Sequence, residues 1–155
     1  MRLSRSIEAE LPDEAATQAL GRALAAALRP GEAICLSGPL GAGKSTLARA
    51  LVRALTTPDE EVPSPTFTLV QFYEGVRLQV AHFDLYRLGS PDEAFEIGLD
   101  EALDEGAAVI EWPERLEDRR PPDRLDIEIT LAGPARRVRL SPKGAWEGRE
   151  IEFGS

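Results

Sequence analysis

Short apolar runs along the chain predict the strands of a central sheet. Residues 33–37 (AICLS) and 107–111 (AAVIE) are apolar at nearly every position, which is typical of strands buried on both faces. Residues 67–73 and 77–85 flank a short Glu-Gly-Val connection and predict two neighbouring strands. Residues 2–10 alternate only weakly, which predicts an edge strand.

A further pair of strands is expected near the C terminus. Residues 125–132 and 136–141 alternate between apolar and polar positions, and Gly133-Pro134 between them suits a turn. These segments therefore predict a C-terminal β-hairpin. The tail after Ser141 has no clear pattern and is assigned to no element.

Apolar residues at helical spacing predict helices between these strands. A stripe of alanine and leucine runs through residues 11–28, where Pro12 suits a first helical turn. Residues 44–55 repeat leucine every four positions, and residues 91–104 predict one or two short helices around Gly98. This order of elements predicts a mixed sheet with helices on both faces.

Length and composition limit the class of protein. The 155 residues suit one domain spanning 1–155, and 27 acidic against 18 basic residues give a net charge of −9. That charge argues against a chain that coats nucleic acid, although it leaves room for a local basic patch. The chain has no run of about 18 apolar residues and no signal-peptide core, so a cytoplasmic protein is expected. Cys35 is the single cysteine, which excludes an intrachain disulfide and a cysteine-rich zinc site; we expect it to pack in the core.

The segment from Gly38 to Ser45 (GPLGAGKS) matches the phosphate-binding pattern G-x-x-x-x-G-K-[ST] between a predicted strand and a predicted helix. Glycines let backbone N–H groups curl around phosphate oxygens, and the helix start adds its positive dipole end. Lys44 can reach the outer phosphates, and the Ser45 hydroxyl can ligate Mg²⁺. The alternative is a glycine turn that caps a helix without a ligand.

These residues predict the fold class and the nucleotide. We expect an α/β, single-domain P-loop nucleoside triphosphatase with a mixed, mostly parallel central sheet flanked by helices and a C-terminal β-hairpin. The guanine-reading patterns N-K-x-D and T-K-x-D are absent, which favours adenine and hence ATP.

Two carboxylates are candidates for the metal and for catalysis. Asp84 and Glu111 each end an apolar run, where they would reach the sheet edge at which the glycine-rich loop opens. Glu111 is the first choice for the metal because its strand is the more apolar. Asp84 would then hold a metal-bound water or orient the attacking water. The alternative is that each acid is solvated at a strand end.

Three other side chains near these positions carry weaker signals. Thr66 lies in residues 62–70 (VPSPTFTLV), where its hydroxyl could sense a γ-phosphate and its metal, although a rigid strand-entry loop is the alternative. His82 is the single histidine and is interpreted as structural. Trp112 follows Glu111 directly, where a tryptophan is more often part of the core.

Four motifs in order narrow the choice among P-loop proteins. The segments LSGPLGAGKSTLARAL, SPTFTLV, HFDLYRL and IEWPERL, within residues 8–140, resemble those of the TsaE family (also called YjeE), the bacterial ATPases needed for threonylcarbamoyladenosine modification of tRNA. Ser45 stands where that family often has threonine, which keeps the hydroxyl.

The resemblance implies partners, cofactors and site residues. It implies an ATPase that uses Mg²⁺ and works with the TsaD and TsaB proteins on tRNAs that read ANN codons, with tRNA held mainly by those partners. It implies metal roles for Ser45, Asp84 and Glu111, and base contacts loosely near residues 13–17. The implied nucleotide-contacting residues are Gly38, Leu40, Gly41, Ala42, Gly43, Lys44, Ser45, Thr46, Trp112, Arg136 and Arg137.

Two other functions stay open at this stage. A small-molecule kinase would need a phosphate-clamping lid, which Arg115, Arg119, Arg120 and Arg124 could form, but the same stretch is also rich in acids and proline. A non-hydrolysing nucleotide switch would have partner binding as its sole output.

Overall fold

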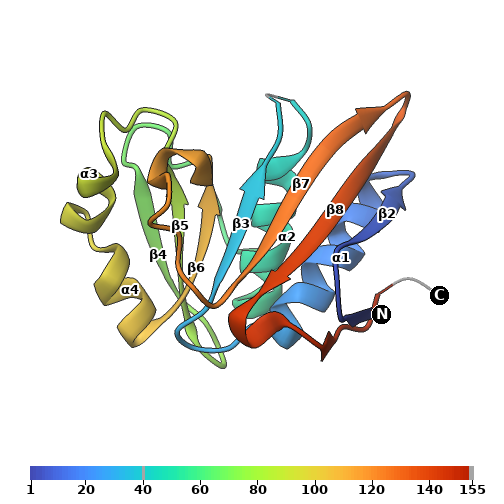
Figure 1. Cartoon of the computed structure of the whole chain (residues 1–155), viewed down its shortest axis with the longest axis horizontal. Coiled ribbons are helices and arrows are strands. Elements are labelled where there is room, and N and C mark those ends of the chain that lie inside the picture. Colours follow the sequence, from blue (N-terminus) through green and yellow to red (C-terminus); the bar gives the residue numbers. More distant parts are fainter. Residues whose placement is uncertain (40, 154–155) are drawn as a thin grey trace.

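The computed structural model describes residues 1–39 and 41–153, which form a seven-stranded mixed sheet with helices on both faces and a separate two-stranded sheet (Figure 1). The strands are β1 (Arg2–Leu3), β2 (Ile7–Leu11), β3 (Ala33–Ser37), β4 (Val70–Glu74), β5 (Gln79–Asp84), β6 (Gly106–Glu111), β7 (Arg124–Ala132), β8 (Ala135–Lys143) and β9 (Arg149–Glu150). The helices are α1 (Glu14–Ala27), α2 (Lys44–Leu55), α3 (Pro91–Glu96) and α4 (Leu99–Glu105), with 3₁₀ turns η1 (Pro113–Leu116) and η2 (Gly144–Trp146).

The main sheet has the strand order β2-β8-β7-β3-β6-β5-β4. The central strands β7, β3, β6 and β5 pair in parallel, whereas β2, β8 and β4 join them by antiparallel pairing. Parallel pairing is therefore confined to the centre of the sheet, and the described part has as many antiparallel as parallel neighbours, rather than the parallel majority expected. The C-terminal hairpin β7–β8 is confirmed. The edge strand expected over residues 2–10 is confirmed only for β2, because β1 pairs with β9 in a separate two-stranded sheet.

Alternating side chains of the central strands build a core on each face of the sheet. Ile34 and Leu36 of β3 face α1 and α2, while Ala33 and Cys35 face the layer formed by α3, α4 and η1. Cys35 is buried as expected, and burial raises the pKa of its thiol to about 12. Both faces are thus covered, which explains why β3 reads as a continuous apolar run.

Helices α1 and α2 pack closely against each other on one face. A Cβ atom at Gly21 would lie 2.6 Å from the Cβ of Ala50, so glycine at this position sets the spacing of the two helices. On the other face, Gly98 separates α3 from α4 with a φ of 104°, a conformation that favours glycine. The expected break around Gly98 is confirmed.

Residues 67–69 were expected to begin a strand, and this expectation is wrong. Leu69 has a φ of 70°, and its N–H donates to the carbonyl of Pro65 at 2.7 Å, so the chain turns here. Strand β4 begins only at Val70. The turn keeps Thr66 close to the end of β5, where Asp84 lies.

The tail after Ser141, left unassigned by its pattern, is part of the fold. Strand β9 pairs with β1, and Trp146 in the intervening turn η2 is fully buried. Arg149 forms a bidentate ion pair with buried Glu32, with both nitrogen–oxygen distances at 2.6 Å. The tail therefore closes the end of the sheet opposite the glycine-rich loop (Figure 1). Within the described residues, none of the helices is long and apolar enough to cross a membrane.

Candidate functional site

The loop between β3 and α2 has a backbone that requires glycine. Gly38 has a φ of 142°, and a Cβ atom there would lie 2.3 Å from the carbonyl oxygen of Ile129. Gly43 caps the start of α2 with a φ of 106°, and Gly41 also has a positive φ. These residues and Ala42 lie where the pattern predicted a phosphate loop, whereas Leu40 lies outside the described residues.

Lys44 begins α2 and its ammonium group lies inside the loop. It donates to the carbonyl of Gly38, and it sits 3.7 Å from the ring centroid of Trp112. Burial lowers the pKa of Lys44, while the nearby carboxylates of Glu111, Glu114 and Asp84 oppose that shift. The arrangement holds a cation at the mouth of the loop.

Two hydroxyl–carboxylate pairs meet beside this ammonium group. Asp84 and Glu111 lie opposite each other where the parallel strands β5 and β6 end. The Ser45 hydroxyl donates to Glu111 Oε1 at 3.2 Å, and the Thr66 hydroxyl donates to Asp84 Oδ2 at 3.2 Å. Four segments that are distant in sequence thus bring together the residues predicted for metal binding and catalysis.

His82 is a functional candidate that the sequence interpretation missed. Its Nε2 donates to Glu111 Oε2 at 2.6 Å, and both side chains are buried. Glu111 therefore has one oxygen on Ser45 and the other on His82, which fixes the carboxylate. The signal in the sequence was the spacing of His82 and Asp84, because residues two apart in a strand share a face.

Trp112 lies at the site and also packs against the core on the face of α3, α4 and η1. It has a φ of 60°, precedes η1, and is half-buried. Its ring lies 5.0 Å from that of Tyr86 at an interplanar angle of 53°, a tilted aromatic pair. The buried core tryptophan of this chain is Trp146.

A cavity of about 320 Å³ unites these groups. Its walls are Gly41, Gly43, Lys44, Ser45, Thr46, Ser64, Thr66, Asp84, Glu111, Trp112 and Arg136. Ser64, which the sequence did not single out, hydrogen-bonds to Thr66 at 2.8 Å. Apart from Leu40 and Arg137, every residue predicted for the site borders this cavity or belongs to its loop.

A second cavity of about 190 Å³ adjoins the first and shares Gly43, Thr46 and Arg136 with it. Residues of the segment 13–17, for which the resemblance implied base contacts, border it. The Arg136 Nε donates to the carbonyl of Ala42 at 3.0 Å, which ties β8 to the loop. Arg137 is exposed and borders neither cavity, because successive side chains of a strand point to opposite faces.

The donor set at the first cavity fits Mg²⁺. The Ser45 hydroxyl and the carboxylates of Glu111 and Asp84 are hard oxygen donors, the kind Mg²⁺ prefers. Residues 1–39 and 41–153 contain no group of three or more His, Cys, Asp or Glu side chains placed to hold a metal ion alone. That composition suits a cation held by one or two carboxylates together with phosphate oxygens and water.

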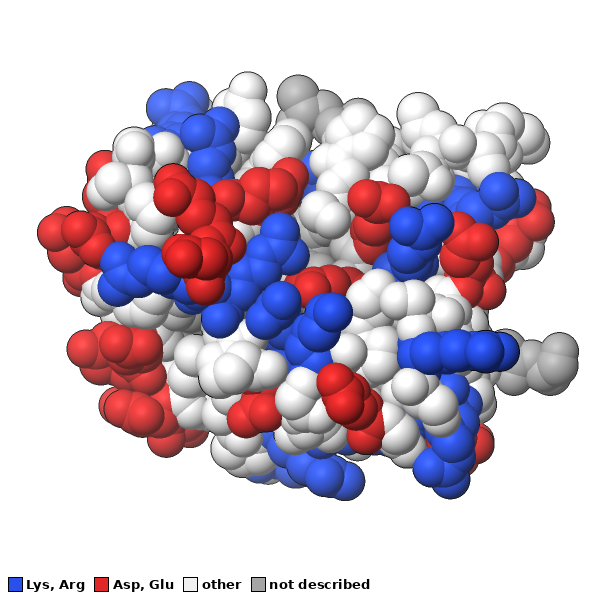
Figure 2. Space-filling model, viewed as in Figure 1, with Lys and Arg blue, Asp and Glu red and all other residues white. Residues whose placement is uncertain are grey.

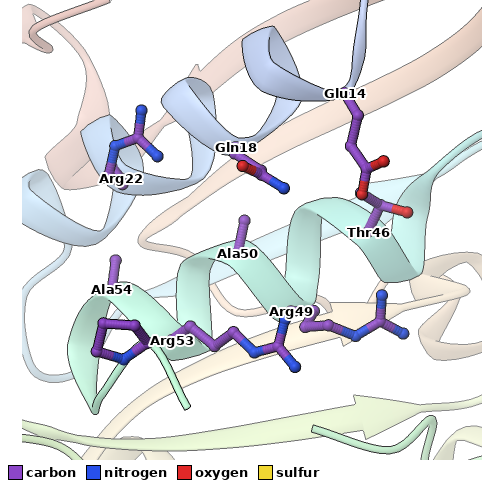
Figure 3. A pocket seen from close by; sticks show the side chains of 9 residues that line it. Glu14, Gln18, Arg22, Thr46, Arg49, Ala50, Arg53 and Ala54 are labelled. Carbon is purple, nitrogen blue, oxygen red and sulfur yellow. The ribbon is translucent and has the colours of Figure 1, made fainter. Parts of the chain in front are cut away.

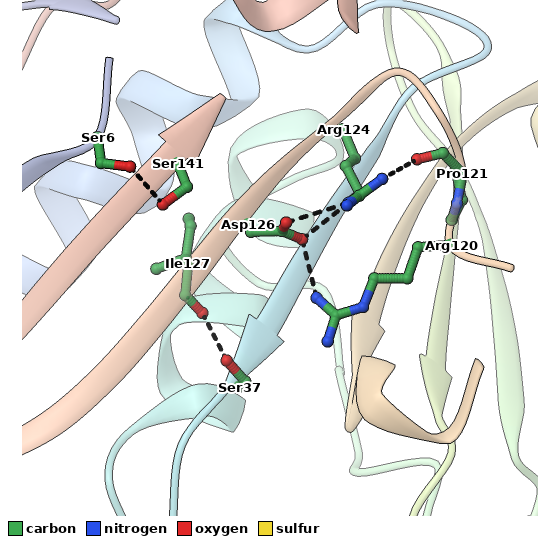
Figure 4. Close-up of polar contacts among 8 residues, drawn as sticks. All are labelled: Ser6, Ser37, Arg120, Pro121, Arg124, Asp126, Ile127 and Ser141. Carbon is green, nitrogen blue, oxygen red and sulfur yellow. Dashed lines mark hydrogen bonds and ion pairs between the residues drawn. The ribbon is translucent and has the colours of Figure 1, made fainter. Parts of the chain in front are cut away.

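Three of the four arginines proposed for a kinase lid have acidic partners, whereas the guanidinium of Arg115 lies 5.8 Å from the ring centroid of Tyr86. The guanidinium groups of Arg120 and Arg124 both bind the carboxylate of Asp126 at 3.1 Å (Figure 4). Arg119 forms an ion pair with Asp92. None of these three borders the first cavity, so the structure does not favour the kinase alternative.

The sheet is covered by helices on both faces. Within it, a buried parallel strand leads through a glycine loop to a helix that begins with lysine. This arrangement defines a P-loop α/β protein. The family model "Threonylcarbamoyl adenosine biosynthesis protein TsaE" matches residues 11–138. The chain belongs to the TsaE family.

Similar proteins agree with this assignment. The tRNA threonylcarbamoyladenosine biosynthesis protein TsaE of Aquifex aeolicus (strain VF5) is 41% identical over 137 residues, covering 88% of this chain and 96% of the relative. That of Bacillus subtilis (strain 168) is 37% identical over 123 residues, covering 79% and 75%. The crystal structure of Bacillus subtilis YdiB superposes with a TM-score of 0.74 at 29% identity, covering 93% of this chain and 88% of that one.

Proposed function

We propose that this chain serves tRNA threonylcarbamoyladenosine biosynthesis by binding and hydrolysing ATP together with the TsaD and TsaB proteins. The observation that carries the proposal is the meeting of a lysine, two hydroxyls and two carboxylates around one cavity at the glycine loop. These groups come from α2, the segment before β4, and the ends of β5 and β6. Their chemistry suits phosphate binding and water activation better than any other function of a small α/β protein.

The glycine loop and α2 would hold the phosphates. The positive end of the dipole of α2 favours an anion at its first turn, which begins at Lys44. The Lys44 ammonium would leave the carbonyl of Gly38 for phosphate oxygens, because a phosphate oxygen carries negative charge and the carbonyl does not. Trp112 would border the phosphates, since it already lies against the ammonium group.

Ser45 and Glu111 would hold Mg²⁺, with Asp84 beside them. The cation, when bound, neutralises charge on the transferred phosphoryl group. Glu111 is suited to this role because Ser45 and His82 together fix its two oxygens. Asp84 accepts hydrogen bonds from Thr66 and from the N–H of Tyr86, and this fixed carboxylate would orient the attacking water.

The second cavity would take the adenine. Leu11 and Pro134 provide apolar walls, while Thr17 and Arg136 provide polar groups at its edge. The acidic net charge of −9 fits a division of labour in which TsaD and TsaB hold most of the tRNA. Figure 2 shows acidic side chains gathered over α3 and α4, a surface unsuited to RNA.

Calorimetric titration of ATP and Mg²⁺ and a phosphate-release assay, each with and without TsaD and TsaB, test the proposal. Lys44→Ala should weaken binding or lower turnover at least about tenfold, because a charge-assisted contact is worth about 1.5–3 kcal/mol. Glu111→Gln should bind ATP within about tenfold of the unsubstituted chain but lose most hydrolysis.

Lys143→Ala is the matched control, since Lys143 is the one other lysine and is exposed on β8. Partners should accelerate phosphate release by the unsubstituted chain. Equal affinity and turnover in Lys44→Ala would rule out the phosphate role of the loop. Phosphorylation of a small metabolite without any effect of TsaD and TsaB would favour a kinase.

A further inference from the structure

A third cavity, of about 350 Å³, lies between α1 and α2 and is lined by arginines. We call it the arginine groove and define it by Gln18, Arg22, Arg49, Ala50, Arg53 and Ala54. Figure 3 shows Gln18 and Arg22 extending from α1 and the other four from α2. The TsaE assignment and the proposed ATP site leave this groove without a role.

The groove continues from the proposed base cavity. Glu14 and Thr46 border both cavities, and Thr46 borders the loop cavity as well. In Figure 3 the side chain of Glu14 reaches toward Thr46 at one end of the groove. An occupant of the groove would therefore lie next to the nucleotide on the outer side of the base.

The three arginines have no acidic partner among the described residues, although the chain is strongly acidic. Arg49 and Arg53 each use Nε on a backbone carbonyl, of Val62 at 3.5 Å and of Glu60 at 3.0 Å. Their terminal nitrogens and the whole Arg22 guanidinium form no hydrogen bond or ion pair within residues 1–39 and 41–153.

Some arginines elsewhere in the chain are paired internally, whereas the groove gathers three that are not paired among the described residues. Arg119, Arg120, Arg124, Arg139 and Arg149 each contact a carboxylate of the chain itself. Unpaired guanidinium groups that share one groove attract anions, and their fork of N–H donors matches a carboxylate in particular. The groove therefore presents positive charge that no carboxylate among the described residues neutralises by direct contact.

We propose that the arginine groove binds an acidic segment of a partner protein, with carboxylates on the arginines and a small apolar side chain on the floor. Ala50 and Ala54 form that floor, and Pro58 closes it at one side. Arg49 and Arg53 are four residues apart on α2, about 6 Å along its axis. Glutamates four residues apart on a partner helix have the same spacing.

The lining argues for protein over RNA. None of the residues that border the groove is aromatic, whereas single-stranded RNA is bound largely by stacking of bases on aromatic rings. Glu14 lies at one end, and the segment Asp59-Glu60-Glu61 follows Pro58 at the other. Three arginines between acidic ends suit a short segment with two carboxylates and not a continuous phosphate backbone.

The test uses the full chain and a fluorescent 12-residue helical peptide that carries two glutamates four residues apart, with leucine and alanine between them. We expect binding that weakens with added salt. The double variant Arg49→Gln/Arg53→Gln should weaken it at least about tenfold, because both of the matched charged contacts are lost. The matched control Arg5→Gln/Arg29→Gln removes the same charge from two exposed arginines outside the groove that form no ion pair among the described residues, and it should leave binding unchanged.

Charge reversal separates a specific contact from general attraction. The variant Arg49→Glu/Arg53→Glu should bind a peptide with lysine in place of both glutamates, and the unsubstituted chain should not. Two results overturn the proposal: equal affinity of the unsubstituted, groove and control chains for the acidic peptide, including no binding by any, or tighter arginine-dependent binding of a 12-nucleotide single-stranded RNA. Neither depends on ATP hydrolysis, so failure here is distinguishable from failure of the proposed ATPase.

Discussion

The hydrogen bond from His82 to Glu111 is expected to affect ATP hydrolysis more than ATP binding. At 2.6 Å it joins two side chains of which only 2% and 3% are exposed. His82→Leu removes the donor and leaves Glu111 Oε2 buried without it. Ser45 would then be the one side chain that still orients this carboxylate.

The size of the effect follows from the nature of the bond. A hydrogen bond to a charged group contributes about 1.5–3 kcal/mol, which corresponds to about 10- to 150-fold in rate if it is lost only in the transition state. Lys44 and the glycine loop make no contact with His82, so ATP affinity should change much less. His82→Gln should restore most of the rate because its amide nitrogen can donate to the same oxygen.

Steady-state phosphate release gives kcat and KM for each variant, and calorimetry gives ATP affinity. Gln79→Leu is the matched control, since Gln79 lies on the same strand and donates to the carboxylate of Glu74 at 2.7 Å, far from the site. Urea unfolding checks that each variant is folded. Unchanged kcat in His82→Leu would refute the reasoning, and equal losses in His82→Gln and His82→Leu would show that ring packing matters and not the hydrogen bond.

Three further predictions concern buried groups and the two tryptophans. Arg149→Leu should lower the free energy of unfolding by about 3–5 kcal/mol in a urea titration, because Glu32 stays buried without its partner. Adding Glu32→Leu to the same chain should recover much of the loss. A loss below about 1 kcal/mol in Arg149→Leu would contradict this prediction. ATP with Mg²⁺ should change the fluorescence of Trp146→Phe but not that of Trp112→Phe, since only Trp112 borders the cavity. Iodoacetamide at pH 8 should spare Cys35 in the folded chain and alkylate it in urea, because burial raises its pKa to about 12 and keeps the thiol protonated; rapid alkylation of the folded chain would show that it is accessible.

Local patterns predicted the elements that carry the site. Strand β3 and helix α2 begin and end where the apolar run and the leucine spacing placed them. Both predictions are correct because the pattern within each segment is sufficient to identify it. Strand β3 is covered on both faces and is therefore apolar throughout, and α2 repeats one apolar stripe. The loop pattern between them then placed Lys44 and Ser45 without any tertiary information.

Tertiary contacts decided what the patterns missed. The turn at Leu69 depends on a positive φ at a leucine, which no propensity predicts. The tail after Ser141 has no alternation because its strand β9 has only two residues, which pair with β1, and because the side chain of Arg149 binds Glu32, which is distant in sequence. The role of His82 depends on its contact with Glu111, which lies on the neighbouring strand β6. The order of strands in the sheet cannot be predicted from the sequence of one strand alone.

Helix α2 connects the proposed nucleotide site with the proposed docking groove. Its first turn supplies Lys44 and Ser45, and its outer face supplies Arg49 and Arg53. These two arginines also donate to carbonyls of the segment 60–62, which leads through Pro63 to Thr66 at the carboxylate of Asp84. A carboxylate bound in the groove would compete for the same guanidinium groups that hold this segment. Docking of an acidic segment and the position of the Thr66 hydroxyl would therefore be physically linked, which would give a partner a route to the rate of the proposed hydrolysis.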